Sequence, residues 1–307
     1  MSPSSETMVA KVRRFNRLVT ERVGALNDHY LARDLPLGQA RVLWEIGNDG
    51  CDVRTLRSRL GLDSGYLSRL LRELEGAGLV SVEPSGRDRR VRTAHLTAGG
   101  VKERALLDHR SDDLARSLLE PLPVAQRDRL VEAMREVERL LTSAMVEIHR
   151  VEPADPRARF CVREYFAEID RRFSKGFDPG ASISADDDEL RPPRGLMLVA
   201  TLRDEPVGCG ALKFHRDAPT ELKRMWVASS TRGLGIGRRL LAELEAEAAR
   251  HGGRVVHLET NGSLKEAIEL YRSAGYEEVD AFNDEPYAHH WFEKRLRGPQ
   301  GTSPAAR

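Results

Sequence analysis

The sequence predicts two domains in one chain. A mainly helical domain is expected over residues 1–145, an α/β domain over residues 146–297, and a disordered tail over residues 298–307. The length of 307 residues is more than one ordinary domain needs. Near residue 146 the pattern also changes, from helical spacing of apolar residues to alternating strand and helix patterns. The last ten residues, GPQGTSPAAR, lack the apolar side chains that a core requires.

Composition narrows the class of protein. Hydrophobic residues make up 40% of the chain and charged residues 32%, which suits two ordinary cores. There is no apolar run of about 18 residues, so we expect no membrane span, and the polar N-terminus does not resemble a secretory signal. The cysteines Cys51, Cys161 and Cys209 are far apart in the sequence and show neither disulfide nor zinc-ligand spacing. A reducing cytoplasm is the expected compartment.

The first domain shows the order of elements typical of a winged helix-turn-helix. Apolar residues at three- and four-residue spacing predict one helix over the first 35 residues, ended by Pro36. Two short apolar runs, Leu79–Glu83 and Val91–Leu96, flank the turn at Pro84–Gly86 and predict a β-hairpin. Further helices are predicted over residues 37–48, 52–60, 63–76, 97–119 and 123–145.

The helix over residues 63–76 suits a DNA groove. Its leucines form one apolar stripe, and the opposite face carries small residues and arginines that can reach base edges or phosphates. Asp63 or Ser64 is the expected helix cap, which would leave the helix N-terminus free for a phosphate. The hairpin turn adds arginines that suit a minor groove, although an isolated charge run is more often simply solvated. The candidate DNA-binding residues are Ser64, Gly65, Ser68, Arg69, Arg72, Arg87, Arg89 and Arg90.

These segments resemble the MarR family of transcriptional regulators. The resemblance runs over residues 35–46, 56–80 and 85–100, and includes Asp88-Arg89-Arg90 followed by Leu96 to Gly100. It implies a homodimer formed by the terminal helices and binding to double-stranded DNA at a palindromic operator. It also implies that Asp88 orients a hairpin arginine while Arg90 contacts DNA. The cysteine-oxidation switch of some relatives is not expected, because no pair of nearby cysteines is evident.

The second domain alternates strands and helices. A strand over MVEIHRV ends at Pro153, and a loop rich in Asp, Gly and Pro follows the first helix of this domain. Strands are predicted over residues 195–203, 206–214, 220–228, 254–260, 276–282 and 288–296, and helices over residues 155–173, 235–251 and 263–274.

A Gly-rich turn lies between the strand over residues 220–228 and the following helix. It reads Arg232-Gly-Leu-Gly-Ile-Gly-Arg238 and directs several backbone N–H groups toward one point, where a pyrophosphate can bind. A simple tight turn is the alternative. The turn contains neither the G-x-G-x-x-G of dinucleotide-binding folds nor the Gly-Lys-Ser/Thr of a P-loop.

The spacing of this turn resembles the GNAT superfamily of acyl-CoA-dependent N-acetyltransferases. Arg232, Gly235 and Gly237 fill its motif, and Ala267 to Tyr276 match the second cofactor motif. The resemblance covers residues 146–297 and implies an α/β fold with a mixed central sheet that uses acetyl-CoA. It implies that Tyr271 is the general acid for the thiolate, although such a tyrosine can simply be packed in the core. The implied cofactor-binding residues are Met225, Trp226, Val227, Arg232, Gly233, Leu234, Gly235, Ile236, Gly237, Arg238, Asn261 and Tyr271.

Acetyl transfer to an amine also requires a base, since an amine of pKa about 10 is mostly protonated at neutral pH. Glu221 opens the central strand where several relatives carry the base, and Glu259 on the neighbouring strand is the competitor. Either carboxylate can instead bind the substrate's ammonium or lie on the surface. The pair His289-His290 has no third ligand at metal spacing, so no metal site is expected.

The resemblances together predict a bifunctional protein that binds operator DNA as a dimer and acetylates a small amine. One alternative is a DNA-binding sensor whose second domain binds an acyl-CoA or an amine without turnover. Another is a protein-lysine acetyltransferase, since the acidic run Asp186–Glu189 can attract a basic peptide.

Overall fold

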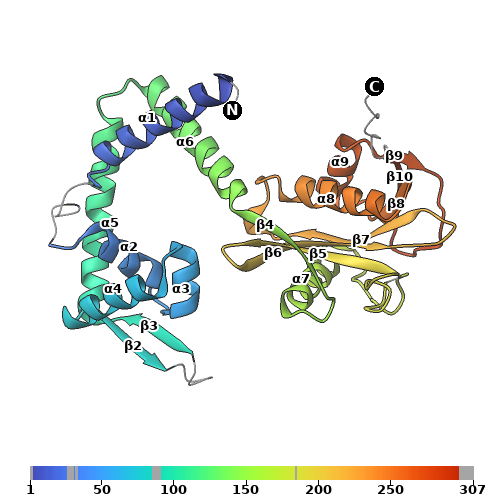
Figure 1. Cartoon of the computed structure of the whole chain (residues 1–307), viewed down its shortest axis with the longest axis horizontal. Coiled ribbons are helices and arrows are strands. Elements are labelled where there is room, and N and C mark those ends of the chain that lie inside the picture. Colours follow the sequence, from blue (N-terminus) through green and yellow to red (C-terminus); the bar gives the residue numbers. More distant parts are fainter. Residues whose placement is uncertain (1–2, 26–30, 32–33, 85–90, 184, 297–307) are drawn as a thin grey trace, which may run out of the picture. The chain divides into compact units, whose positions relative to one another are not determined.

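The computed structural model describes residues 3–25, 31, 34–84, 91–183 and 185–296 (Figure 1). The hairpin arginines Arg87, Arg89 and Arg90, with Asp88, and the tail over residues 298–307 lie outside these residues. The chain divides into two compact units, Met1–Met134 and Arg135–Arg307. The division falls inside a helix, before the predicted boundary at residues 145 and 146. None of the helices in the described part of the chain has the length and apolar character that a membrane span requires.

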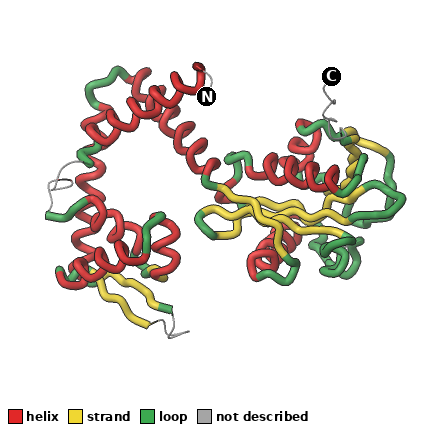
Figure 2. Tube along the Cα trace, viewed as in Figure 1, coloured by secondary structure: helices red, strands yellow, loops and turns green. Residues whose placement is uncertain are grey.

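The first unit is mainly helical with a small sheet (Figure 2). The predicted helix, helix and hairpin order is confirmed, and the strands pair in the order β1-β3-β2. Leucines of α4 and residues of α2 and β3 form its buried core. The elements are α1 (Pro3–Arg22), α2 (Leu37–Ile46), β1 (Cys51–Asp52), α3 (Val53–Leu60), α4 (Ser64–Gly76), β2 (Val80–Pro84), β3 (Arg92–Leu96), α5 (Ala98–Leu119) and α6 (Val124–Ala144).

The prediction of one helix over the first 35 residues is wrong. Helix α1 ends at Arg22, and a turn follows in which Gly24 has φ 68°. That left-handed backbone conformation cannot continue an α-helix, and glycine adopts it at little cost. The short strand β1 was also not predicted, because two residues are too few to show a period of two.

The second unit is a seven-stranded sheet with helices on both faces, in the order β4-β5-β6-β7-β8-β10-β9. Figure 1 shows α7 on one face and α8 and α9 on the other. Strands β7 and β8 are parallel and the other described pairs are antiparallel, so the predicted mixed sheet is confirmed. The elements are β4 (Val146–Val151), α7 (Pro156–Arg172), β5 (Gly195–Leu202), β6 (Glu205–Lys213), β7 (Thr220–Val227), the 3-10 helix η2 (Ser229–Thr231), α8 (Ile236–Arg250), β8 (Val255–Thr260), α9 (Lys265–Ser273), β9 (Glu277–Val279) and β10 (His290–Arg295).

Alternation along the strands supplies two cores. On β5, Leu196, Leu198 and Ala200 pack in the cluster that includes the α8 residues, whereas Met197 and Val199 pack in the cluster that includes the α7 residues. Successive strand residues point to opposite faces of a sheet. Burial on both faces therefore explains why β5 is an unbroken apolar run rather than an alternating one.

The central strands separate where the functional site forms. Strand β7 pairs with β8 only through Thr220–Val256 and Glu221–His257. Further along β7, Arg224 and Met225 together lie opposite the single residue Gly210, which is a β-bulge, and Arg224 has φ 53°. The second half of β7 is therefore not paired with β8, and its backbone N–H and C=O groups face an opening in the sheet.

Folding also brings two of the distant cysteines together. Cys161 on α7 donates through Sγ to the backbone oxygen of Gly208, the residue before Cys209 on β6, and both cysteines are fully buried. The expectation that no two cysteines lie near each other is therefore wrong. Sequence distance hid the contact because α7 packs across the face of β6.

Candidate active site and candidate DNA-binding surface

Two cavities adjoin along α7 in the second unit. The larger, of about 430 Å³, is lined by α7, the end of β7, the Gly-rich turn and the facing residues of α8 and α9. The smaller, of about 90 Å³, lies between α7, β7, β8 and the loops that precede β5 and β10. Tyr165, Ile169 and Leu264 line both cavities. A ligand in one cavity therefore comes close to a ligand in the other.

The Gly-rich turn presents an uncapped helix N-terminus to the larger cavity. Gly233 and Gly235 have φ 83° and 77°, and Gly235 is the N-cap of α8 with no side chain to accept a hydrogen bond. The first N–H groups of an α-helix have no partner within the helix. Together with the helix dipole they favour an anion at this end of the cavity.

Charged side chains line the same cavity. Arg232 donates to Glu168 and, through Nε, to the backbone oxygen of Val227. Arg172 pairs with Glu168 and Glu266. Arg238 donates to Ser273 Oγ at 2.8 Å. The lining of the larger cavity therefore contains three guanidinium groups and two carboxylates, and its net charge is positive.

Most of the predicted cofactor residues line the larger cavity, including the three motif residues Arg232, Gly235 and Gly237. Leu234 does not, because it packs against the hydrophobic core. Asn261 lines the smaller cavity instead. Its Nδ2 donates to the backbone oxygen of Tyr287, and its Oδ1 accepts from the backbone N–H of Ser263. Asn261 thus fixes two loops around the smaller cavity.

Tyr271 lies on α9 with its ring in the core and lines the larger cavity. Its ring contacts those of Tyr276 and Phe292, with centroids 5.8 and 6.0 Å away. Burial raises the pKa of Tyr271 above its ordinary value, so the hydroxyl keeps its proton at neutral pH. Tyr271 can therefore be packed in the core and still act as a general acid toward a ligand in the larger cavity.

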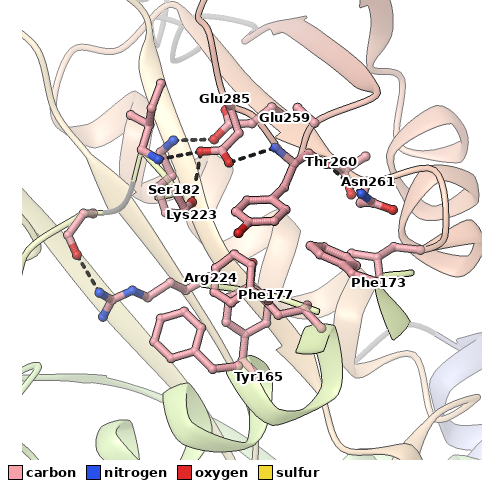
Figure 3. Close-up of a pocket in the computed structure, with 17 residues that line it drawn as sticks. Tyr165, Phe173, Phe177, Ser182, Lys223, Arg224, Glu259, Thr260, Asn261 and Glu285 are labelled. Atoms are coloured by element: carbon pink, nitrogen blue, oxygen red, sulfur yellow. Dashed lines mark hydrogen bonds and ion pairs between the residues drawn. The ribbon is translucent and has the colours of Figure 1, made fainter. Parts of the chain in front are cut away.

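The two candidate bases lie in different surroundings, and Figure 3 shows one of them, Glu259. Glu259 lines the smaller cavity, and its Oε1 accepts from Lys223 Nζ at 2.5 Å. Glu221 does not line either cavity, and it pairs with Lys223 at 3.0 Å and with His215 at 2.7 Å. Burial raises the pKa of Glu221, but the charge of Lys223 and the other nearby cations outweigh burial and the pKa is lowered. The position in the cavity therefore favours Glu259 over Glu221 as the base, and the lowered pKa of Glu221 makes that carboxylate a weak base.

Several lining residues of the smaller cavity were not found from the sequence. Glu285 is buried and accepts from Ser182 Oγ and from the backbone N–H groups of Ile183 and Tyr287. Lys223 and Arg224 come from the bulged part of β7. Aromatic residues of α7 and of later loops also line this cavity, and they match no sequence motif. The rings that form the aromatic wall are Phe166, Phe173, Phe177 and Tyr287.

In the first unit, the predicted DNA-binding face of α4 is exposed, from Ser64 and Gly65 through Ser68 to Arg69 and Arg72. The guanidinium of Arg69 lies over the ring of Tyr66, 5.1 Å from its centroid.

The N-cap of α4 is Asp63, which accepts from the backbone N–H of Tyr66. Asp63, one of the two predicted caps, is therefore confirmed. Its carboxylate uses one N–H of the α4 N-terminus, and binding of a phosphate at this terminus stays a prediction. The exposed arginines are then the main groups that this face offers to an anion.

Comparison with known proteins matches two segments of the chain to two protein families. Residues 162–276 match the model of the acetyltransferase (GNAT) family, and residues 33–91 match the model of the MarR family. An IAA acetyltransferase from Azospirillum brasilense is 34% identical over 127 residues, which are 41% of this chain and 82% of that protein.

Two solved structures illustrate the likeness of each half. A GNAT-family acetyltransferase from Staphylococcus aureus Mu50 is 17% identical with a TM-score of 0.42, covering 50% of this chain and 99% of that one. The PcaV transcriptional regulator from Streptomyces coelicolor is 22% identical with a TM-score of 0.36, covering 42% of this chain and 94% of that one. The family matches and the relative place the chain in the GNAT family of N-acetyltransferases, as an acyltransferase that also carries a MarR-family segment.

Proposed function

We propose that the second unit transfers the acetyl group of acetyl-CoA to an amine held in the smaller cavity, and that the first unit binds a palindromic DNA site as part of a homodimer. The observation that carries the enzymatic proposal is the meeting of the two cavities beside the opening between β7 and β8. One cavity ends at an anion-binding helix terminus and the other holds a buried carboxylate.

The residues of the larger cavity fit coenzyme A. The uncapped N–H groups of α8, with Arg232 and Arg238, suit its diphosphate. The unpaired edge of β7 around Met225 to Val227 suits the amide groups of the pantetheine arm. The thioester supplies the acetyl group. N–H groups on that edge can also donate to its carbonyl oxygen as negative charge develops there.

The proton movements follow from the two sides of the site. Glu259 accepts a proton from the acceptor ammonium, directly or through water, and the free amine attacks the thioester carbon. The carbon–nitrogen bond would form at the thioester carbon, the nitrogen would release its second proton to solvent, and the carbon–sulfur bond would then break. Tyr271, which burial keeps protonated, donates to the departing thiolate. Glu221 has a positioning role: it forms an ion pair with Lys223, and Lys223 also forms an ion pair with Glu259.

The proposed DNA-binding function rests on the first unit. The exposed arginines of α4 suit phosphate and base contacts. Helix α1 exposes an apolar stripe that a single chain leaves in water. A second copy of the chain, packed on this stripe, is the proposed partner. The exposed apolar residues of α1 are Met8, Val9, Val12, Phe15, Leu18 and Val19.

The first experiment is acetyl-CoA binding to the full chain by calorimetry, followed by a free-thiol assay with a panel of amines and amino acids. Binding with thiol release for at least one acceptor supports the enzyme and identifies its substrate class. Binding without release favours the sensor, or an acceptor that is a protein. Absence of binding contradicts the cofactor assignment.

A further inference from the structure

The smaller cavity contains two buried polar atoms of opposite character that have no hydrogen-bond partner among the described residues. They are Nε of Arg224, a donor, and Oε2 of Glu259, an acceptor. Both residues line the cavity. Their side chains are 12% and 10% exposed. Buried polar atoms of native proteins nearly always have a partner, so each unpaired atom in this cavity requires an explanation.

The bulge in β7 brings the charges of two consecutive residues into one cavity. In a regular strand Lys223 and Arg224 would point to opposite faces of the sheet. Here both line the smaller cavity, because Arg224 has φ 53° and shares one opposing residue with Met225. A positive φ at an arginine is unfavourable, and its occurrence at this point favours a functional role for the direction in which Arg224 points.

The Glu259 side of the cavity suits an ammonium group. Lys223 Nζ lies 2.5 Å from Glu259 and 3.0 Å from Glu221, so one lysine faces two carboxylates. Glu221 also pairs with His215 outside the cavity, whereas Glu259 lines the cavity and its unpaired Oε2 can accept a hydrogen bond there. In surroundings from which water is largely excluded, the charge of Glu259 attracts a cation more strongly than it would at the surface.

The Arg224 side suits a carboxylate. Its Nη2 donates to the backbone oxygen of Ala185, which carries no net charge. The carboxylate paired with it, Asp187, is 4.0 Å away and half exposed. The positive charge of Arg224 is therefore only weakly compensated by nearby carboxylates, and its Nε remains free to donate a hydrogen bond. The edge of a guanidinium group matches the two oxygens of a carboxylate.

Part of the remaining wall of this cavity is aromatic, and the space is small. The rings of Phe173, Phe177 and Tyr287 pack against one another with centroids 4.9 to 5.9 Å apart. A cavity of about 90 Å³ in contact with these rings suits a small or medium apolar group.

We infer that the acceptor is an amino acid with an apolar side chain, held through its amine at Glu259 and through its carboxylate at Arg224. The inference rests on the proposed function, since the amine at Glu259 is the group that receives the acetyl group. The bulge of β7 then determines specificity, because it places the carboxylate-binding arginine next to the lysine and glutamates that surround the amine.

The test compares three acceptors of similar shape in the free-thiol assay: leucine, leucinamide and isoamylamine. Leucinamide lacks the carboxylate charge, and isoamylamine lacks the whole group. We expect leucine to have the highest kcat/KM, by about 10- to 100-fold, as for the loss of one charge-assisted pair. The amine of leucinamide is the less basic, so leucinamide would react faster if the carboxylate contributed nothing. An equal or higher kcat/KM for either analogue overturns the inference.

The variant Arg224→Gln assigns the effect to one residue. It should lower kcat/KM for leucine much more than for leucinamide, so the ratio of leucine to leucinamide falls to one or below. Arg224→Lys, which keeps the charge, should retain part of the ratio. Arg191→Gln is the control for loss of a guanidinium elsewhere: Arg191 pairs with Asp188 and, through Nε, with Glu152, and does not line the cavity, so its loss should leave the ratio unchanged. A retained ratio in Arg224→Gln overturns the role of Arg224.

Calorimetry with acetyl-CoA separates this inference from the proposed function. Wild-type protein that binds acetyl-CoA and acetylates only amines without a carboxylate refutes the amino-acid acceptor and leaves the enzyme in place. Binding without turnover of any amino acid also refutes it. Absence of acetyl-CoA binding refutes the proposed function, and the inference with it.

Discussion

The carboxylate of Glu168 on α7 holds the guanidinium of Arg232, the first residue of the Gly-rich motif. Arg232 Nη2 donates to both oxygens of Glu168, at 2.5 and 2.6 Å. The same carboxylate accepts from Trp226 Nε1 at 3.0 Å and from Arg172 at 3.1 Å. Burial raises the pKa of Glu168, but the hydrogen bonds from Arg232 and Arg172 outweigh it, so the pKa lies below its ordinary value. One carboxylate therefore organises three donors at the wall of the larger cavity.

Replacing Glu168 by glutamine should destabilise the protein at neutral pH. We expect a loss of about 1–2 kcal/mol, the low end for hydrogen bonds to charged groups because solvent partly screens the pair. A carboxyl with a lowered folded-state pKa contributes stability above its unfolded pKa and loses it as the pH falls through the folded value. The difference between wild type and Glu168→Gln should therefore shrink below about pH 4. Thermal unfolding of the wild type and of Glu168→Gln, at neutral pH and below about pH 4, measures the difference in stability. An equal difference at the two pH values would contradict this account.

The exposed pair of Glu243 with Arg250 provides the control for that experiment. Exposed ion pairs contribute little, so Glu243→Gln should change stability by less than about 0.5 kcal/mol.

Removing the hydroxyl of Tyr271 should slow the chemical step without affecting cofactor binding. We expect Tyr271→Phe to lower kcat by about 10²- to 10⁴-fold, the usual contribution of a general acid, with an unchanged Kd for acetyl-CoA. Because burial raises the pKa of Tyr271, wild-type kcat should show no fall from loss of this proton up to about pH 9. Steady-state kinetics and calorimetry test both points.

Two other tyrosines serve as comparisons for Tyr271. Tyr276 is also buried, with an unpartnered hydroxyl, but does not line the larger cavity, so Tyr276→Phe should keep most of kcat. Tyr165 lines both cavities. If Tyr165→Phe alone loses turnover, the proton donor is Tyr165 and not Tyr271.

The glycines at the two ends of α8 separate backbone strain from cofactor binding. Gly235 at the N-terminus has φ 77° and Gly252 beyond the C-terminus has φ 84°, and an added Cβ meets nothing within 4 Å at either position. Alanine at each should cost about 1–2 kcal/mol of stability through the same backbone strain. Only Gly235→Ala should also weaken acetyl-CoA binding, by calorimetry. Equal weakening by Gly252→Ala would show that the effect is general destabilisation.

The arginines of α4 should contribute to DNA affinity through charge. Arg69→Ala should weaken binding to a random duplex of about 30 base pairs and reduce the slope of log K against log salt by about one, if Arg69 contacts a phosphate. Fluorescence anisotropy at several salt concentrations gives the slope. Arg116 on α5, which pairs with Asp113, is the control for loss of one positive charge. An unaltered slope in Arg69→Ala would remove Arg69 from the phosphate contacts.

A charge on the apolar stripe of α1 should dissociate the proposed dimer. Phe15 is 47% exposed in the single chain, so Phe15→Glu should not disturb the fold. Burying its carboxylate between two copies would be unfavourable. We expect monomers by analytical ultracentrifugation, with loss of tight binding to palindromic DNA. A mass equal to that of wild type would show that α1 is not the interface.

The sequence by itself determined the order of the elements and the Gly-rich turn. The stripe of leucines on α4 and the unbroken apolar run of β5 predict a helix and a strand because side-chain periodicity is a local property. The positive φ values at Gly233 and Gly235 agree with the motif, since only glycine adopts them freely. The end of α1 at Arg22 was missed because one glycine gives a weak stop signal.

The tertiary structure alone decided which charged and polar groups share a cavity. Glu221 and Glu259 are equivalent candidates in the sequence, but the opening between β7 and β8 exposes Glu259 to the smaller cavity and leaves Glu221 outside it. The positions of Arg224 and Asn261, and the closeness of Cys161 to Cys209, depend on a bulge, a loop and a helix packed across a sheet. These are contacts between residues far apart in the chain. Periodicity and motif spacing describe only neighbours in sequence, so neither can predict them.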